Sequence, residues 1–143
     1  MDLIYADETR KELGVVKNHT FDLAYGSDEN DFSLKMALDD YICKEGYFVY
    51  IDGTEYGGII DTVKVDTEGD EVTYTGRTWH GILEKKILEP DAGEDYLYLD
   101  GELNAVLADI LSRCGLFGLF SASQEDSGFS VRQYQAERYA DAY

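Results

Sequence analysis

The sequence has little proline, little cysteine and little positive charge. Its 143 residues include one Pro and two Cys, and 12 Lys and Arg stand against 30 Asp and Glu, so the net charge is −18. A surface this negative repels phosphate groups, and direct binding of nucleic acid or anionic lipid is therefore not expected. No apolar run approaches the roughly 18 residues of a membrane-spanning helix. We expect neither nucleic acid nor a membrane as a partner.

Motifs for catalysis or cofactor binding are also missing. The sequence contains no H-x-x-x-H, C-x-x-C, G-x-S-x-G or phosphate-binding glycine loop. His19 and His80 have no second ligand at metal spacing, and Cys43 and Cys114 lie in apolar surroundings typical of reduced core thiols. Residues 66–70 resemble the start of a calcium loop, but Arg77 stands where the bidentate Glu belongs. We predict no catalytic residue, no metal and no cofactor, and a protein that is not an enzyme.

Aromatic residues and glycine are abundant, with 12 Tyr, 6 Phe and 14 Gly. This composition is typical of a β-rich domain with many tight turns. Alternating apolar residues predict strands within 15–25 and 31–36. Asp52-Gly53 predicts a hairpin between strands 47–51 and 56–66, and a further strand over 72–77 completes a three-stranded antiparallel meander. The tyrosines of these strands, and two that follow them, are expected to fill cross-strand pairs, with a sugar-binding platform as the alternative. They are Tyr47, Tyr50, Tyr56 and Tyr74, with Tyr96 and Tyr98 beyond.

Two helices are expected after the meander, at about 79–88 and 101–114. The first carries an apolar stripe that we expect to be buried, and it stops before Pro90. The second has Asp100 as its expected N-cap and Gly115 just beyond its last turn. Residues 134–143 look like the start of a third helix. These elements indicate a single α+β domain over 1–143. The stripe of the first helix consists of Trp79, Ile82, Leu83 and Ile87.

Several short patterns occur in a fixed order along most of the chain. A Phe-x-Leu strand is followed by Gly58-Ile59-Ile60, by Gly76-Arg77-Thr78-Trp79-His80-Gly81-Ile82-Leu83 and by a stop at Pro90. Arg138-Tyr139 closes the series. This order resembles the N-terminal domain of tail-tip hub proteins of siphophages and of prophages in Gram-positive bacteria. The resemblance singles out structural or interaction residues, namely Gly58, Gly76, Arg77, Trp79, Gly81, Pro90, Arg138 and Tyr139.

The resemblance implies a barrel-like β domain with inserted helices, acting as a virion structural protein. Such a baseplate hub joins the tail tube to the distal tip, and its expected partners are the tail tube, the distal tail protein, the tape measure and two further copies in a homo-trimer. It is expected in the virion tail after assembly and in the host cytoplasm before release. Members of this family are longer, so we expect the chain to be the N-terminal part of a longer tail protein.

Two other interpretations remain open on the sequence alone. One is a fragment of a carbohydrate-acting enzyme that uses two of the many carboxylates. The other is an acidic protein that mimics DNA, which the net charge permits. Arg77 ends a strand in an acidic chain, and we expect a carboxylate or C-terminal carbonyls to hold its guanidinium.

Overall fold

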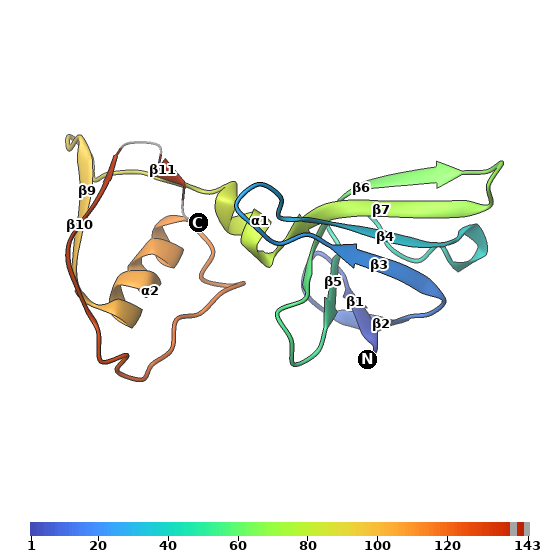
Figure 1. Cartoon of the computed structure of the whole chain (residues 1–143), viewed down its shortest axis with the longest axis horizontal. Coiled ribbons are helices and arrows are strands. Elements are labelled where there is room, and N and C mark those ends of the chain that lie inside the picture. The colour runs from blue at the N-terminus through green and yellow to red at the C-terminus, as the bar shows by residue number, and fades with distance from the viewer. Residues whose placement is uncertain (138–139, 142–143) are drawn as a thin grey trace. The chain divides into compact units, whose positions relative to one another are not determined.

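A computed structural model describes residues 1–137 and 140–141 (Figure 1). The chain forms two compact units, Met1–Ile82 and Leu83–Tyr143. The strands of the first unit build an antiparallel sheet, and two α-helices follow it along the chain. The predicted α+β class is therefore confirmed. That all 143 residues form one domain stays a prediction.

The first unit is a seven-stranded antiparallel sheet in the order β2-β1-β5-β6-β7-β4-β3. The predicted meander is confirmed as β5, β6 and β7, which are neighbours in this order. A short 3-10 helix, Leu38–Asp40, follows β4. The strands are β1 (Leu3–Ala6), β2 (Glu12–Val16), β3 (His19–Leu23), β4 (Asp31–Ala37), β5 (Phe48–Ile51), β6 (Gly57–Asp66) and β7 (Glu71–Thr78).

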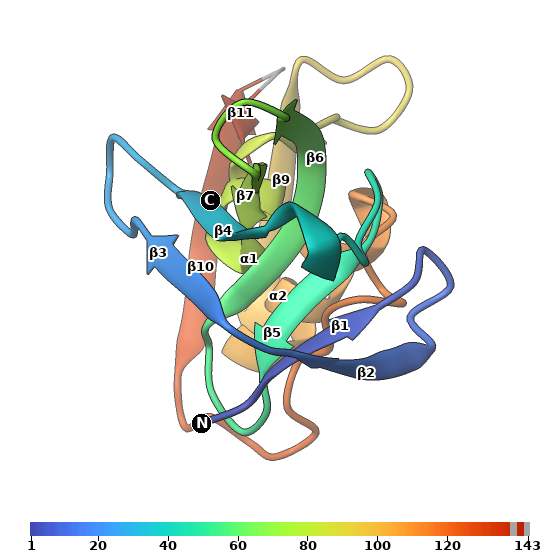
Figure 2. The same ribbon diagram turned by 90° about the vertical axis from the view of Figure 1, so that its right-hand side faces the viewer.

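The two edge strands of this sheet are consecutive in the sequence. Only Lys17 and Asn18 separate β2 from β3, although five strands lie between them in the sheet. The sheet must therefore curl until its edges meet at this corner, where Asn18 adopts a left-handed conformation (φ 50°). Figure 2 shows the strands curling around the axis of view. No β2–β3 pairing occurs within the described residues, so the sheet is barrel-like but not closed.

The interior of the curled sheet is filled by alternate residues of almost every strand. Leu34 and Tyr74 are fully buried, and Cys43 lies among them on the loop before β5. Burial raises the pKa of the Cys43 thiol to about 12, so this cysteine is an inert core residue, as predicted. The remaining fully or nearly fully buried members of the cluster are Leu3, Val16, Phe32, Met36, Val49, Ile60 and Val72.

The second unit consists of α2 (Leu103–Arg113) on a two-stranded antiparallel sheet, β9 (Tyr96–Glu102) and β10 (Ser130–Glu137). Helix α2 packs on both strands. Strands β8 (Ile87–Leu88) and β11 (Ala140–Asp141) form a second, shorter pair. The side chains buried between helix and strands include Leu97, Leu99, Val106, Leu111 and Ala136.

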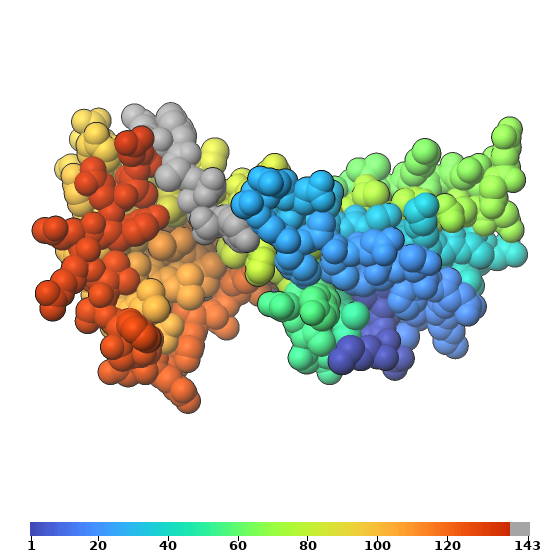
Figure 3. Space-filling view, viewed as in Figure 1, coloured from blue at the N-terminus to red at the C-terminus, as the bar shows by residue number. Residues whose placement is uncertain are grey.

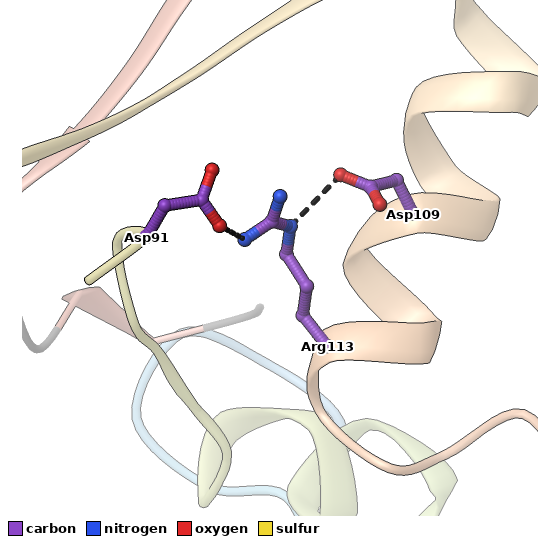
Figure 4. Close-up of polar contacts among 3 residues, drawn as sticks. All are labelled: Asp91, Asp109 and Arg113. Atoms are coloured by element: carbon purple, nitrogen blue, oxygen red, sulfur yellow. Dashed lines mark hydrogen bonds and ion pairs between the residues drawn. The ribbon is translucent and has the colours of Figure 1, made fainter.

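Arg113, at the end of α2, fastens the loop between β8 and β9. Its Nη1 lies 3.0 Å from Asp91 Oδ1, and its Nε donates to Asp109 Oδ2 at 2.9 Å, one helical turn earlier. Figure 4 shows the guanidinium between the two carboxylates. Hydrogen bonds to Asp109 and Asp91 raise the pKa of Arg113. Two of the many carboxylates, Asp91 and Asp109, thus bind one guanidinium, and the contact with Asp91 holds the loop between β8 and β9.

The prediction of the first helix, at about 79–88, is wrong beyond Glu84. Helix α1 (Trp79–Glu84) has six residues, and Ile87 and Leu88 belong to β8. Pairing of β8 with β11 replaces the last helical turn, which buries Leu88 and leaves Ile87 53% exposed. Ile82 is buried as predicted, but Ile87 does not continue its stripe.

The other helix predictions need smaller corrections. Helix α2 begins at Leu103, and its N-cap is Glu102 rather than Asp100, because Gly101 and Glu102 pair with β10. Gly115 follows the helix with φ 68°, as predicted. Residues 134–137 lie in strand β10 and not in a helix. At the start of α2 and at residues 134–137, the strand pairing that replaces the expected helix involves a partner strand distant in sequence. The local sequence therefore does not indicate this pairing.

Tyr74 provides a test of the core. Its hydroxyl oxygen accepts a hydrogen bond from the backbone amide of Cys43 (3.4 Å), and the ring is fully buried. Tyr74→Phe leaves that amide without this partner and should lower the free energy of unfolding by about 1–3 kcal/mol. Tyr56→Phe, at a ring that is 42% exposed, should change it by less than about 0.5 kcal/mol. Coincident urea denaturation curves for the two variants would contradict this account.

Candidate functional site

Four of the residues singled out by sequence gather where β6, β7 and α1 meet. Gly58 pairs with Thr78, and Gly76 pairs with Ile60, so the two glycines lie on neighbouring strands. Arg77 lies between Gly76 and Thr78 on β7, and Gly81 lies in the first turn of α1. We call this set, Gly58, Gly76, Arg77 and Gly81, the glycine junction.

Gly58 and Gly76 allow the backbones of β6 and β7 to approach closely. A Cβ atom at Gly58 would lie 2.0 Å from the carbonyl oxygen of Arg77, and one at Gly76 would lie 1.9 Å from that of Ile59. Carbon and oxygen atoms that are not bonded cannot come this close. Both obstacles are backbone atoms, which no side-chain rotation removes. The close approach of the two strands therefore requires glycine at both positions.

Gly81 brings the first turn of α1 against the loop before β4. A Cβ atom there would lie 2.2 Å from the carbonyl oxygen of Asn30. The same carbonyl accepts hydrogen bonds from the amide and the hydroxyl of Thr78, both at 3.0 Å. Thr78 is fully buried, and its hydroxyl oxygen accepts in turn from the amide of Gly81. The helix is thereby tied to the loop through main-chain atoms.

Arg77 is held by a carboxylate, as predicted. Its Nε and Nη2 donate to Asp61 Oδ2 and Oδ1 at 2.8 and 2.7 Å, a bidentate pair. Asp61 is the unpaired residue of a β-bulge, since the β6–β7 register shifts between Ile60 and Thr62. The hydrogen bonds to Asp61 raise the pKa of Arg77. The bulge points its carboxylate at the arginine and fixes the register of the hairpin.

Trp79 lies beside this junction, on the first residue of α1. Its ring stacks on Phe48, with ring centroids 6.1 Å apart and an angle of 22° between the planes. Gly57 makes room for it, because a Cβ atom there would lie 2.9 Å from Trp79 Cζ2. The indole is half-buried rather than fully buried.

The remaining residues singled out by sequence do not belong to the glycine junction. Pro90 lies in the loop after β8, in the second unit. Arg138 and Tyr139 lie outside the described residues. Conversely, Asp61, Asn30 and Thr78 complete the junction and were not singled out. A lone Asp or Asn in an acidic chain carries no signal of its partner, which lies on another strand.

The polar side chains near the glycine junction have structural contacts. Within residues 1–137 and 140–141, no three His, Cys, Asp or Glu side chains are placed to hold a metal ion. His80 packs edge-on against Tyr25, with ring centroids 5.2 Å apart. In residues 66–70, the segment that resembles the start of a calcium loop, Asp66 Oδ1 accepts hydrogen bonds from the amides of Glu68 and Gly69. This carboxylate therefore closes a turn. These hydrogen bonds lower the pKa of Asp66.

Of the tyrosines considered as a possible sugar-binding platform, some are buried in the interior and others are exposed at the surface. Tyr74 is fully buried, whereas Tyr96 and Tyr98 are exposed side by side on β9, with ring centroids 6.2 Å apart. Their planes are tilted by 54°. The rings therefore do not form one flat surface.

No helix in the described part of the chain is long and apolar enough to cross a membrane. Comparison of the chain with protein-family models, with curated proteins and with solved structures gives no match.

The close approach at Gly76 predicts a large effect of one methyl group. Gly76→Ala forces β6 and β7 apart and should lower the free energy of unfolding by about 3 kcal/mol, at the upper end of overpacking. Gly26→Ala is the matched control, since a Cβ atom there would meet nothing nearer than 3.9 Å. The control should be neutral or slightly stabilising. Equal losses in the two variants, measured by chemical denaturation, would contradict the argument.

The Arg77–Asp61 pair predicts a smaller effect. Both side chains are about one third exposed (35% and 36%), so Arg77→Ala should lower stability by about 1 kcal/mol. Lys35→Ala removes a longer contact with Glu71 (3.6 Å, 49% and 45% exposed) and should have almost no effect. Thermal melts that rank Lys35→Ala as the more damaging change would refute the structural role of Arg77.

Proposed function

We propose that the chain is a structural component of a phage or prophage tail tip, a baseplate hub that joins the tail tube to the distal tip. The observation that carries the proposal is the glycine junction. The central residues of the resemblance to tail-tip hub proteins, Gly58, Gly76, Arg77 and Gly81, are also the residues that fix the packing of β6, β7 and α1.

A pattern of this kind specifies a fold. Each glycine is required by a backbone atom less than about 2.5 Å from where its Cβ would lie, and Arg77 is engaged by Asp61. A resemblance in such positions is therefore a resemblance in architecture, and function follows from it by analogy. The hub proteins of the family use their architecture for assembly, which makes an assembly role the natural proposal.

The charge distribution supports structural use of the carboxylates. Asp7 accepts hydrogen bonds from Thr9 and Lys11, and its pKa is lowered, chiefly by the Thr9 hydroxyl. Glu102 caps α2 and also accepts from Ser127, whose hydroxyl is the main cause of its lowered pKa. Carboxylates that close turns and cap a helix favour a scaffold over the two alternatives, a DNA mimic and a carbohydrate-acting enzyme fragment.

The proposed partners are the tail tube, the distal tail protein, the tape measure and further copies of the chain, in a homo-trimer. The curled sheet leaves β2 and β3 as edges, and Leu13 and Val15 on β2 are exposed. Free strand edges with apolar side chains are surfaces on which other chains can add. The proposed location is the virion tail after assembly and the host cytoplasm before release.

Immunogold labelling of released particles tests this function. Phage particles from the bacterium that carries this sequence are labelled with an antibody raised against the chain, and gold is expected at the distal end of the tail. Pre-immune serum is the control. Gold on the heads, or particles that carry no label while the chain remains in the cells, would refute the hub proposal.

A further inference from the structure

The chain contains two Asp-Gly pairs, Asp52-Gly53 and Asp100-Gly101, and the fold holds them in different ways. In an Asp-Gly pair the amide nitrogen of glycine can reach the side-chain carboxyl group, because glycine has no Cβ atom that hinders the approach. Both aspartates are exposed, so access of water does not distinguish the two pairs. The difference lies in the hydrogen bonds and in the backbone around them.

The first pair forms the tip of the turn between β5 and β6. Asp52 has a negative φ and Gly53 has a φ of 70°, which is the combination typical of a type II turn. The amide of Thr54 closes the turn by donating to the carbonyl oxygen of Ile51 at 3.2 Å. The peptide unit between Asp52 and Gly53 is the central one of the turn and takes no part in that hydrogen bond.

The reacting groups of the first pair are free of hydrogen bonds. Within residues 1–137 and 140–141, neither the Asp52 carboxylate nor the amide of Gly53 has a hydrogen-bond partner. Both residues are exposed. In Figure 3 the green atoms of this turn lie at the surface of the first unit. The side chain of Asp52 can therefore rotate toward the following amide without breaking a hydrogen bond.

The second pair lies in a strand and is held at both residues. Gly101 is paired with Val131 of β10, which fixes the extended backbone of β9. The Asp100 carboxylate accepts a hydrogen bond from the amide of Gln133 at 2.5 Å. That amide belongs to the irregular stretch of β10 between Val131 and Tyr134, where the register shifts. Ring closure at Asp100 requires the loss of this hydrogen bond and a rotation of the paired strand.

We propose that Asp52 is a site of spontaneous isomerisation to isoaspartate, and that the fold protects Asp100 from the same reaction. The amide nitrogen of Gly53 attacks Cγ of Asp52, a bond between nitrogen and Cγ forms, and the carboxyl oxygen leaves as water. The product is a five-membered succinimide ring. The inference concerns the chemistry of the chain itself and does not rest on the proposed function.

Water then opens the ring. When it adds to the backbone carbonyl carbon of Asp52, the bond from that carbon to the nitrogen breaks, and the main chain continues through Cβ and Cγ as isoaspartate. When it adds to Cγ, the original aspartate returns. One water is released and one is consumed, so the reaction needs no oxidant, reductant or other co-reactant.

The reaction lengthens the main chain of the turn by one carbon atom. Glu55 lies on the same turn, and its carbonyl oxygen accepts a hydrogen bond from the hydroxyl of Tyr25 at 2.8 Å. The turn thus also holds the loop between β3 and β4, and isomerisation alters the position of that attachment. Isoaspartate has the mass and the charge of aspartate, so neither the intact mass nor the net charge of the chain reveals it.

The test follows both residues in the full chain during incubation at neutral pH, well below its melting temperature. Trypsin then releases them in separate peptides, 45–64 and 87–113, and electron-transfer fragmentation identifies isoaspartate by cleavage of its Cα–Cβ bond. We expect isoaspartate to accumulate at residue 52 at least about tenfold faster than at residue 100, because a charge-assisted hydrogen bond must break first at residue 100.

Two controls separate the fold from the dipeptide. In urea that unfolds the chain, both pairs lose their surroundings, and the two rates should become similar. Asp52→Glu removes the five-membered ring and should leave peptide 45–64 free of isoaspartate; a signal there would assign the reaction to Asp61 and overturn the proposal. Similar rates at residues 52 and 100 in the folded chain, or no reaction at residue 52 while it reacts in urea, would overturn it as well.

Discussion

The close approach of β6, β7 and α1 is the constraint on which the first unit depends. Backbone atoms occupy the space that side chains at Gly58, Gly76 and Gly81 would need, so the three segments meet through main-chain contacts. Such contacts hold the end of the hairpin and the start of the helix at fixed positions. The Asp61 bulge then sets the register beyond them, and Arg77 locks it.

Excess negative charge is compatible with this fold because several carboxylates have structural partners. Asp61 binds Arg77, Asp91 and Asp109 bind Arg113, and Glu102 caps α2. Each partnership replaces water by a protein donor, which offsets part of the cost of ordering the side chains.

The two units differ in how they use apolar residues. In the first, the curl of the sheet encloses a continuous core with Leu34 and Tyr74 at its centre. In the second, one helix on two strands covers only one helical face, and a two-stranded sheet with so small a core is marginal by itself. Exposed Leu103, Leu107 and Phe129 follow from that geometry.

The elements that local chemistry controls could be predicted from the amino-acid sequence. Alternation and Asp52-Gly53 were sufficient for the β5–β6–β7 meander, and Gly115 marked the end of α2, because turns and caps depend on adjacent residues. Three other features depend on the folded chain: β8 in place of a helical turn, β10 in place of a new helix, and Asp61 as the partner of Arg77. Each of these features depends on a strand or side chain that is distant in sequence. The free energy gained by pairing with it outweighs the local preference of the segment, and the local sequence contains no pattern that indicates the partner.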